Sequence, residues 1–147
     1  MRYFIEIAYN GSAYHGWQKQ LEQITVQGVL EAALATALQQ KIDTTGAGRT
    51  DTGVHALQFF AHFDVEKKIV DIENLIYKLN TILPADVAVR SIFKVAKKKH
   101  ARFDALAREY TYYVNIKKDP FKQNSAYYVK KKLDIDLMNK AGEVLLK

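Results

Sequence analysis

The chain has 147 residues, of which 48% are hydrophobic, and this is enough apolar material to build a real core. It contains no cysteine, which excludes disulfides and thiolate metal sites and fits the cytoplasmic location that we expect. No run approaches the ~18 apolar residues of a membrane span, and no signal-peptide pattern opens the chain, so we expect no membrane association. The formal net charge of +6 favours a polyanionic partner.

The first half of the chain is predicted to contain a strand, a helix and two further strands. These elements are expected over residues 3–9, 25–38, 41–45 and 57–65. Period-two alternation indicates the strands, and apolar residues at helical spacing indicate the helix, with Thr25 as its N-cap. The loop before the helix carries the only tryptophan, Trp17. We expect this ring to pin the loop to the core rather than to stack on a nucleobase.

The second half adds two helices and further strands. These elements are expected over residues 72–82, 87–95, 108–116, 127–129 and 133–147. Asp71 can cap the first of these helices. A basic run, 97–99, leads into Arg102 and fits either a solvated connection or a phosphate contact. Tyr110 and Tyr112 fall on one face of the alternating stretch 108–116, where a buried ring is the more common role for a tyrosine.

The order of these elements predicts an α+β fold. Strand-helix-strand-strand-helix-strand is the ferredoxin-like β-α-β-β-α-β arrangement, an antiparallel sheet with its helices on one face. We expect residues 1–147 to form one domain.

A glycine-rich loop is expected between the strands 41–45 and 57–65. Residues 46–55 read Gly-Ala-Gly-Arg-Thr-Asp-Thr-Gly-Val-His, so that Arg49 and Asp51 stand two positions apart. The spacing of the glycines fails as a dinucleotide fingerprint and as a P-loop, and the four histidines lack the spacing of a metal site. We therefore expect neither a metal site nor a nucleotide-binding site of these two kinds. An ionised Asp beside a guanidinium can act as a nucleophile or a general base.

The string Gly-Arg-Thr-Asp-x-Gly-Val-His resembles the signature of the TruA family of tRNA pseudouridine synthases. Further matches follow in the same order along the chain. They include Tyr9-Asn10-Gly11, Gly16-Trp17-Gln18, Thr25-Val26-Gln27-Gly28, His62-Phe63-Asp64, Leu83-Pro84-x-Asp86-Val87, His100-Ala101-Arg102-Phe103 and Arg108-x-Tyr110-x-Tyr112. The resemblance implies an isomerase that converts uridines at positions 38 to 40 of the tRNA anticodon arm to pseudouridine, without metal or cofactor, as a homodimer.

The resemblance also implies roles for single residues. Asp51 corresponds to the catalytic Asp, and Arg49 to an arginine that holds the flipped-out RNA. Tyr110 corresponds to the tyrosine that stacks on the target uracil, and Tyr112 supports it. His55 and Arg102 are the remaining candidates for substrate binding. Proteins of this family continue into a second half of similar architecture, so we expect this chain to be an N-terminal half that is inactive alone.

Two other readings stay open at this point. A non-catalytic RNA-binding module with a ferredoxin-like sheet would explain the charge and the tyrosines, but it gives the Arg49–Asp51 loop no role. A small-molecule enzyme that uses Asp51 as a base would not bind tRNA in a salt-dependent way.

Overall fold

The structure is a computed structural model that describes residues 1–123 and 125–146. The chain divides into two compact units, Met1–Ala107 and Arg108–Lys147, here called the N-terminal and C-terminal units. This division does not test whether residues 1–147 form one domain, so the single domain stays a prediction. No helix among the described residues has the length and the apolar character needed to cross a membrane.

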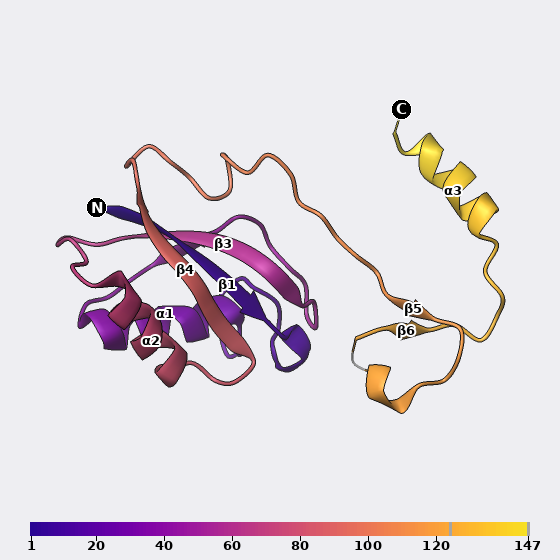
Figure 1. Ribbon diagram of the computed structural model, residues 1–147, viewed down its shortest axis with the longest axis horizontal. Helices are drawn as coiled ribbons and strands as arrows, with labels where there is room; N and C mark the ends of the chain where they lie inside the picture. Colours follow the sequence, from indigo (N-terminus) through magenta and orange to yellow (C-terminus); the bar gives the residue numbers. More distant parts are fainter. Residues whose placement is uncertain (124, 147) are drawn as a thin grey trace. The chain divides into compact units, whose positions relative to one another are not determined.

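The N-terminal unit is built around one four-stranded antiparallel sheet (Figure 1). Its elements follow the predicted order. They are β1 (Arg2–Tyr9), α1 (Val26–Leu38), β2 (Thr44–Gly46), β3 (Ala56–Asp64), α2 (Ile72–Ile82) and β4 (Val87–Val95). The strand order in the sheet is β2-β3-β1-β4, which is the ferredoxin-like topology. The predicted α+β fold class is therefore confirmed.

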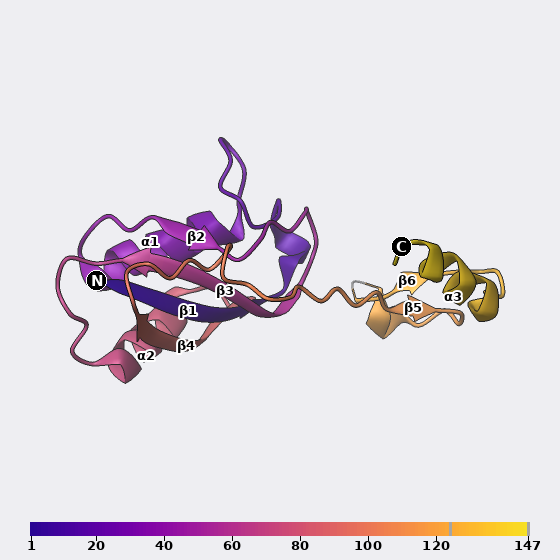
Figure 2. The same ribbon diagram turned by 90° about the horizontal axis from the view of Figure 1, so that it is seen from above.

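Strand β1 lies at the centre of the sheet, with β3 and β4 on its two sides. Ile5 stands opposite Ala61 on β3 and Ile92 on β4, and all three side chains are buried. Every second residue of β1 joins one core with the inner faces of α1 and α2. Both helices lie on the same side of the sheet (Figure 1), α1 toward β2 and α2 toward β4 (Figure 2). Period-two alternation in β1 thus produces one buried face.

The predicted helix starts are confirmed by their caps. The Thr25 hydroxyl oxygen accepts a hydrogen bond from the Gly28 backbone N–H at 3.3 Å. The Asp71 carboxylate accepts one from the Asn74 N–H at 2.8 Å. Each cap satisfies an N–H group that the first helical turn leaves without an intrahelical partner.

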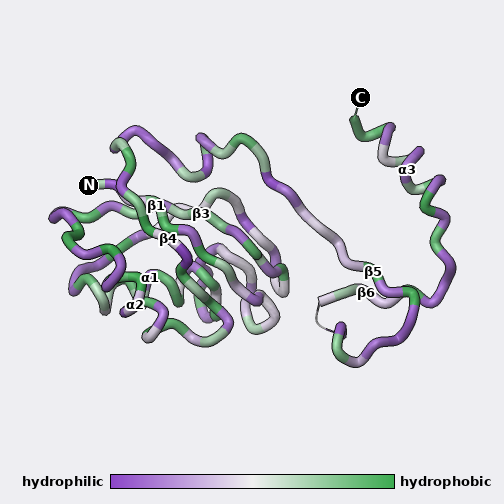
Figure 3. Tube along the Cα trace, in the orientation of Figure 1, coloured by the Kyte–Doolittle hydropathy of each residue, from purple (hydrophilic) through white to green (hydrophobic). Residues whose placement is uncertain are grey.

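The C-terminal unit contains little regular structure. It has two short parallel strands, a 3-10 turn and one helix. These are β5 (Val114–Asn115), β6 (Tyr127–Tyr128), the turn Pro120–Lys122 and α3 (Ile135–Val144). The helix begins at the cap of Asp134 and alternates between hydrophobic and hydrophilic residues (Figure 3). The helix predicted over 133–147 is confirmed within these bounds, although Lys147 lies outside the described residues.

The strand predicted over 108–116 is wrong for most of its length. Only Val114 and Asn115 are in a strand, and their partners on β6 cover two residues. A strand needs hydrogen bonds to a neighbour, and alternation in the sequence cannot supply them. The strand predicted over 41–45 likewise begins only at Thr44, where pairing with β3 begins, and it runs to Gly46.

A side chain on α2 stabilises an irregularity in β4. The register between β1 and β4 shifts between Glu6 and Ile7, next to Val89. There the Asn80 amide donates to the Val89 carbonyl at 2.9 Å and accepts from the Val89 N–H at 2.7 Å.

We expect Asn80→Ala to lower the free energy of unfolding by about 1–2 kcal/mol, because both backbone groups of Val89 lose their partner. Urea denaturation with Asn74→Ala on the same helix as control measures this, and an equal loss in both variants would contradict it.

Candidate active site

Asp51 lies on the loop that joins β2 to β3, residues 47–55, here called the Asp51 loop. The strands on both sides belong to the sheet, as predicted. Within the loop the Val54 N–H donates to the Asp51 carbonyl at 3.2 Å, which closes a turn around Gly53. Gly53 has a φ of 80°, a conformation that glycine adopts without steric cost.

The residue before Asp51 is bound through both its backbone and its side chain. The Thr50 carbonyl accepts a hydrogen bond from the Trp17 N–H at 3.1 Å. The Thr50 hydroxyl lies 2.9 Å from the hydroxyl of Tyr9, the last residue of β1. Two hydrogen bonds therefore position the chain immediately before the Asp51 carboxylate.

The residues after Asp51 are hydrogen-bonded to the loop between β1 and α1, which also contains Trp17. The Gly53 N–H donates to the Tyr14 carbonyl at 3.3 Å. The Gly11 N–H donates to Nδ1 of His55 at 3.0 Å. One ring nitrogen of His55, a residue predicted to bind substrate, is thus occupied within the protein.

Tyr14 is in turn fixed to the start of β4. Its hydroxyl donates to the Asp86 carboxylate at 2.6 Å, while the Asp86 carbonyl accepts from the Asn10 N–H at 2.8 Å. Burial, followed by the hydrogen bond and the charge of Asp86, raises the pKa of Tyr14. The hydroxyl therefore stays protonated and remains a donor.

Two glycines allow the loops to approach at the level of the backbone. A Cβ atom on Gly16 would stand 2.2 Å from the Thr50 carbonyl oxygen, and one on Gly11 would stand 2.0 Å from the Val54 carbonyl oxygen. Neither position accommodates a side chain. The segment 9–17 and the Asp51 loop thus contact each other where a side chain would separate them.

The Asp51 side chain itself is exposed. Arg49 and Asp51 form no ion pair with each other in the described part of the chain. The role of Arg49 as a positive charge near Asp51 therefore stays a prediction. Arg49 lines a pocket whose lining residues do not include Asp51.

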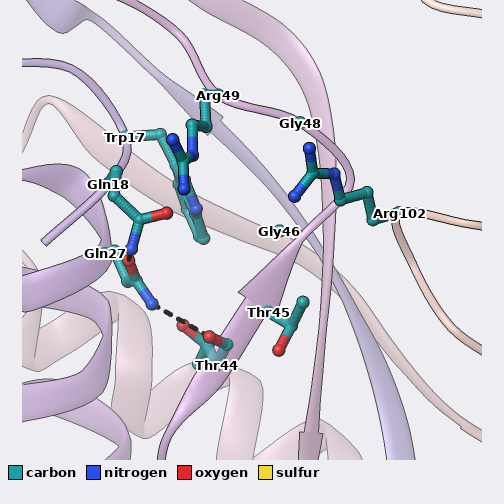
Figure 4. A pocket seen from close by; sticks show the side chains of 9 residues that line it. All are labelled: Trp17, Gln18, Gln27, Thr44, Thr45, Gly46, Gly48, Arg49 and Arg102. Atoms are coloured by element: carbon teal, nitrogen blue, oxygen red, sulfur yellow. Dashed lines mark hydrogen bonds between the residues drawn. The ribbon is translucent and has the colours of Figure 1, made fainter.

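This pocket of about 130 Å³ brings together residues from four segments of the N-terminal unit (Figure 4). The guanidinium groups of Arg49 and Arg102 both extend into it. We call it the two-arginine pocket. Its lining residues are Trp17, Gln18, Gln27, Thr44, Thr45, Gly46, Gly48, Arg49 and Arg102. Two of the predicted substrate-binding residues, 53 positions apart in the printed sequence, thus share one pocket.

The floor of the two-arginine pocket is a hydrogen-bonded network. The Gln27 amide nitrogen donates to the Thr44 carbonyl at 2.9 Å and to the Glu31 carboxylate at 3.1 Å. Its oxygen accepts from the Gln18 side chain at 3.1 Å and from the Lys19 N–H at 2.9 Å. Because the Gln27 amide donates two hydrogen bonds and accepts two, its side chain has one preferred orientation. The floor of the pocket is therefore rigid.

Trp17 belongs to the core, as predicted. The residue is 1% exposed, and its ring lies 4.4 Å from that of Phe59, measured between centroids. A Cβ atom on Gly46 would stand 2.6 Å from the indole Nε1. The ring thus packs directly against the end of β2.

Arg102 reaches the pocket because the connection after β4 is attached to the sheet. The Ala101 N–H donates to Nδ1 of His62 on β3 at 3.1 Å. Arg2 on β1 donates to the Lys99 carbonyl at 2.8 Å and forms an ion pair with Asp64 at 2.7 Å. These contacts fix the backbone on the N-terminal side of Arg102.

His62 can accept this hydrogen bond only while Nδ1 carries no proton. Burial, followed by the charges of Arg2 and His100, lowers the pKa of His62 to about 4, while the charge of Asp64 acts in the opposite direction. His62 is therefore neutral near pH 7. Its neutral ring is part of what places Arg102.

The two tyrosines predicted to bind substrate lie in the C-terminal unit. Tyr110 is 56% exposed and Tyr112 is 86% exposed, both outside any strand. The common role of a buried strand tyrosine therefore does not apply to either. Within residues 1–123 and 125–146, no group of three or more His, Cys, Asp or Glu side chains is arranged as a metal site.

Reasoning from residue chemistry missed the residues that position the Asp51 loop. Tyr9, Tyr14 and Asp86 have no reactive role of their own, and their partners are distant in the sequence. The one available signal was their place within or beside the segments that resemble the TruA family, since Tyr9 and Asp86 stand in two of those segments.

The fold and the loop define a ferredoxin-like domain that presents an exposed carboxylate beside an arginine-lined pocket. Residues 6–104 match a protein family described as tRNA pseudouridine synthase. Because this match covers more than half of the chain, the chain belongs to the tRNA pseudouridine synthase family.

Individual relatives agree over nearly the whole chain. It is 49% identical over 144 residues to the tRNA pseudouridine synthase A of Parabacteroides distasonis and 46% identical to that of Bacteroides fragilis. It is 40% identical over 149 residues to that of Chlamydia felis. These alignments cover 98%, 98% and 99% of this chain but 57%, 57% and 56% of the relatives. The chain thus spans little more than half the length of these relatives.

The close approach of the two loops can be tested at Gly16, which has a φ of 79°. We expect Gly16→Ala to lower the free energy of unfolding by about 2–4 kcal/mol, because strain and a clash with the Thr50 carbonyl combine. Gly53→Ala is the matched control, since φ there is 80° but a Cβ atom would meet nothing within 4 Å. It is expected to cost only about 1–2 kcal/mol. Equal losses, measured by urea denaturation, would show that the loops can separate without cost.

The role of His62 predicts a pH dependence of stability. Its pKa is about 4 in the folded chain and 6.5 as the ordinary value, so the unfolded chain binds more protons between these limits. Stability should therefore fall as the pH drops from 6.5 to 4. His62→Gln, which keeps an acceptor for the Ala101 N–H, is expected to lose less stability over that interval. Urea midpoints at pH 4.5 and pH 7 measure this, and parallel losses would contradict it.

Proposed function

We propose that the protein to which this chain belongs converts uridine to pseudouridine in tRNA, at positions 38 to 40 of the anticodon arm, with Asp51 as its catalytic residue. Membership of the tRNA pseudouridine synthase family supports the reaction. The observation that carries the assignment of Asp51 is structural. Its carboxylate is exposed, while hydrogen bonds to Thr50 and Gly53 fix the backbone on both sides of it. A fixed backbone with a free carboxylate suits a nucleophile that must meet an extruded base.

The reaction rearranges bonds and needs no external reagent. Asp51 attacks either uracil C6 or ribose C1′, and in both routes it supplies an electron pair for a covalent bond. The C1′–N1 bond breaks, the base rotates, and a C1′–C5 bond forms. The bond to Asp51 then breaks, the hydrogen on C5 leaves as a proton, and N1 gains a proton. Neither oxidant, reductant nor cofactor enters this balance.

The other predicted site residues would bind the RNA around Asp51. Arg49 and Arg102 already share one pocket, which supports a joint role in the proposal. The exposed ring of Tyr110 is suited to stack on uracil, with Tyr112 as support. His55 fits a positioning role, because its Nδ1 accepts from the Gly11 N–H and so fixes the end of the Asp51 loop.

The complete site requires more than these residues. The relatives extend well beyond the length that this chain covers, and we propose that a second half supplies a further basic residue and another RNA-binding wall. We further propose a cytoplasmic homodimer with tRNA as its partner. Under this proposal the 147-residue chain alone is inactive, and turnover at the full-length rate would contradict that.

Tritium release from C5-labelled uridine in tRNA tests Asp51 directly, because the hydrogen on C5 leaves in the reaction. We expect the full-length protein to release tritium and its Asp51→Asn variant to be slower by at least about a thousandfold. Asp43→Asn removes the same charge at an exposed position before β2 and should leave the rate unchanged.

Binding of unlabelled tRNA completes the test. If Asp51→Asn binds tRNA normally but does not release tritium, the carboxylate is catalytic. If wild type and Asp51→Asn are equally active, Asp51 is not the catalytic residue. If both proteins bind tRNA but neither releases tritium, the protein is a non-catalytic RNA-binding module.

A further inference from the structure

We infer that the two-arginine pocket binds one phosphodiester group of the RNA strand that carries the reacting uridine. This rests on the proposed function and makes it specific, since it assigns one chemical group of the substrate to one pocket. The ligand is the backbone of the strand and not a base.

The charge of the pocket favours an anion. Arg49 and Arg102 contribute two guanidinium groups, and the nine described residues that line the pocket include no acid. The carboxylate of the floor network, Glu31, forms an ion pair with Lys19 at 3.2 Å. Arg presents a planar set of N–H donors that matches two oxygens of a phosphate group. The side chains of Gln18 and Thr45 add neutral polar groups at the wall. An anion with several oxygens can therefore meet donors from more than one direction.

The shape of the pocket disfavours a nucleobase. Bases in single-stranded RNA are bound by stacking on exposed aromatic faces. The one aromatic residue in the lining is Trp17, which is 1% exposed and packs against Phe59. Its ring offers no free face. A volume of about 130 Å³ suits a compact group such as a phosphate with its ester oxygens.

Both arginines are presented by backbone that is already fixed. Arg49 precedes Thr50, whose carbonyl and hydroxyl are bound to Trp17 and Tyr9. Arg102 follows Ala101, whose N–H is bound to His62. Little backbone entropy is therefore lost when an anion binds, and this favours a specific contact over diffuse attraction.

The position of the pocket identifies the strand. Gly46 and Gly48 line it together with Arg49, and Asp51 stands two residues further along the same loop. A phosphate bound by Arg49 is thus held by the loop that carries the nucleophile. The bound group therefore orients the strand whose uridine must reach Asp51.

Salt-dependent tRNA binding by the full-length protein tests this inference. Loss of one phosphate contact reduces the magnitude of the slope of log K against log salt by about one. We expect a reduction of up to this size for Arg49→Ala and for Arg102→Ala. Affinity at low salt should fall about tenfold. Lys78→Ala removes an exposed charge on α2 and should leave the slope unchanged. Arg102→Lys should keep most of the slope but lose affinity, because it lacks the planar fork.

A single uncharged methylphosphonate in the RNA strand locates the contact. We expect one position near the target uridine at which this substitution weakens binding by wild type but not by Arg102→Ala. Losses that add independently at every position would overturn the inference, as would an unchanged slope in both arginine variants. These readings use binding alone. They therefore stay interpretable if Asp51→Asn proves active, in which case the proposed function fails separately.

Discussion

The approach of two loops at the level of their backbones is the constraint on which the N-terminal unit depends. A Cβ atom at Gly16 would lie 2.2 Å from the Thr50 carbonyl, so the contact exists only because glycine stands there. The hydrogen bond from the Trp17 N–H to Thr50 then fixes the Asp51 loop, and the Trp17 ring supports the neighbouring pocket. The backbone of the Asp51 loop, and with it the position of Arg49 in the two-arginine pocket, thus depends on a contact that only glycine allows.

The sheet could be predicted from the sequence because its information is local. Alternation along β1 and the caps at Thr25 and Asp71 each involve neighbouring residues, and these elements lie where they were expected. Alternation failed over 108–116, where most residues lack the pairing that a strand requires. A local pattern indicates what a segment can form, but pairing with a distant segment decides whether it forms.

The sequence singled out Arg49 and Arg102 separately, but it did not predict that they line one pocket. Spacing suggested that Arg49 would serve Asp51, whereas Arg49 shares a pocket with Arg102. No spacing rule relates residues so far apart. Their proximity comes from the hydrogen bond between Ala101 and His62, in which a buried histidine contributes an acceptor rather than a metal ligand or a base. Tyr14 and Asp86 escaped notice for the same reason, since their importance lies in the partner that each one contacts.

The contacts that arrange the site also determine when it can appear during folding. They join Tyr9 to Thr50, Gly11 to His55 and His62 to Ala101, across separations of 41, 44 and 39 residues. Contacts of such range require the entropy cost of closing a long loop, so we expect them to form late in folding. A nascent or partly unfolded copy would therefore display Arg49, Asp51 and Arg102 on unconnected loops. The two-arginine pocket therefore exists only once the sheet is complete, because its two guanidinium groups come from segments that distant contacts join.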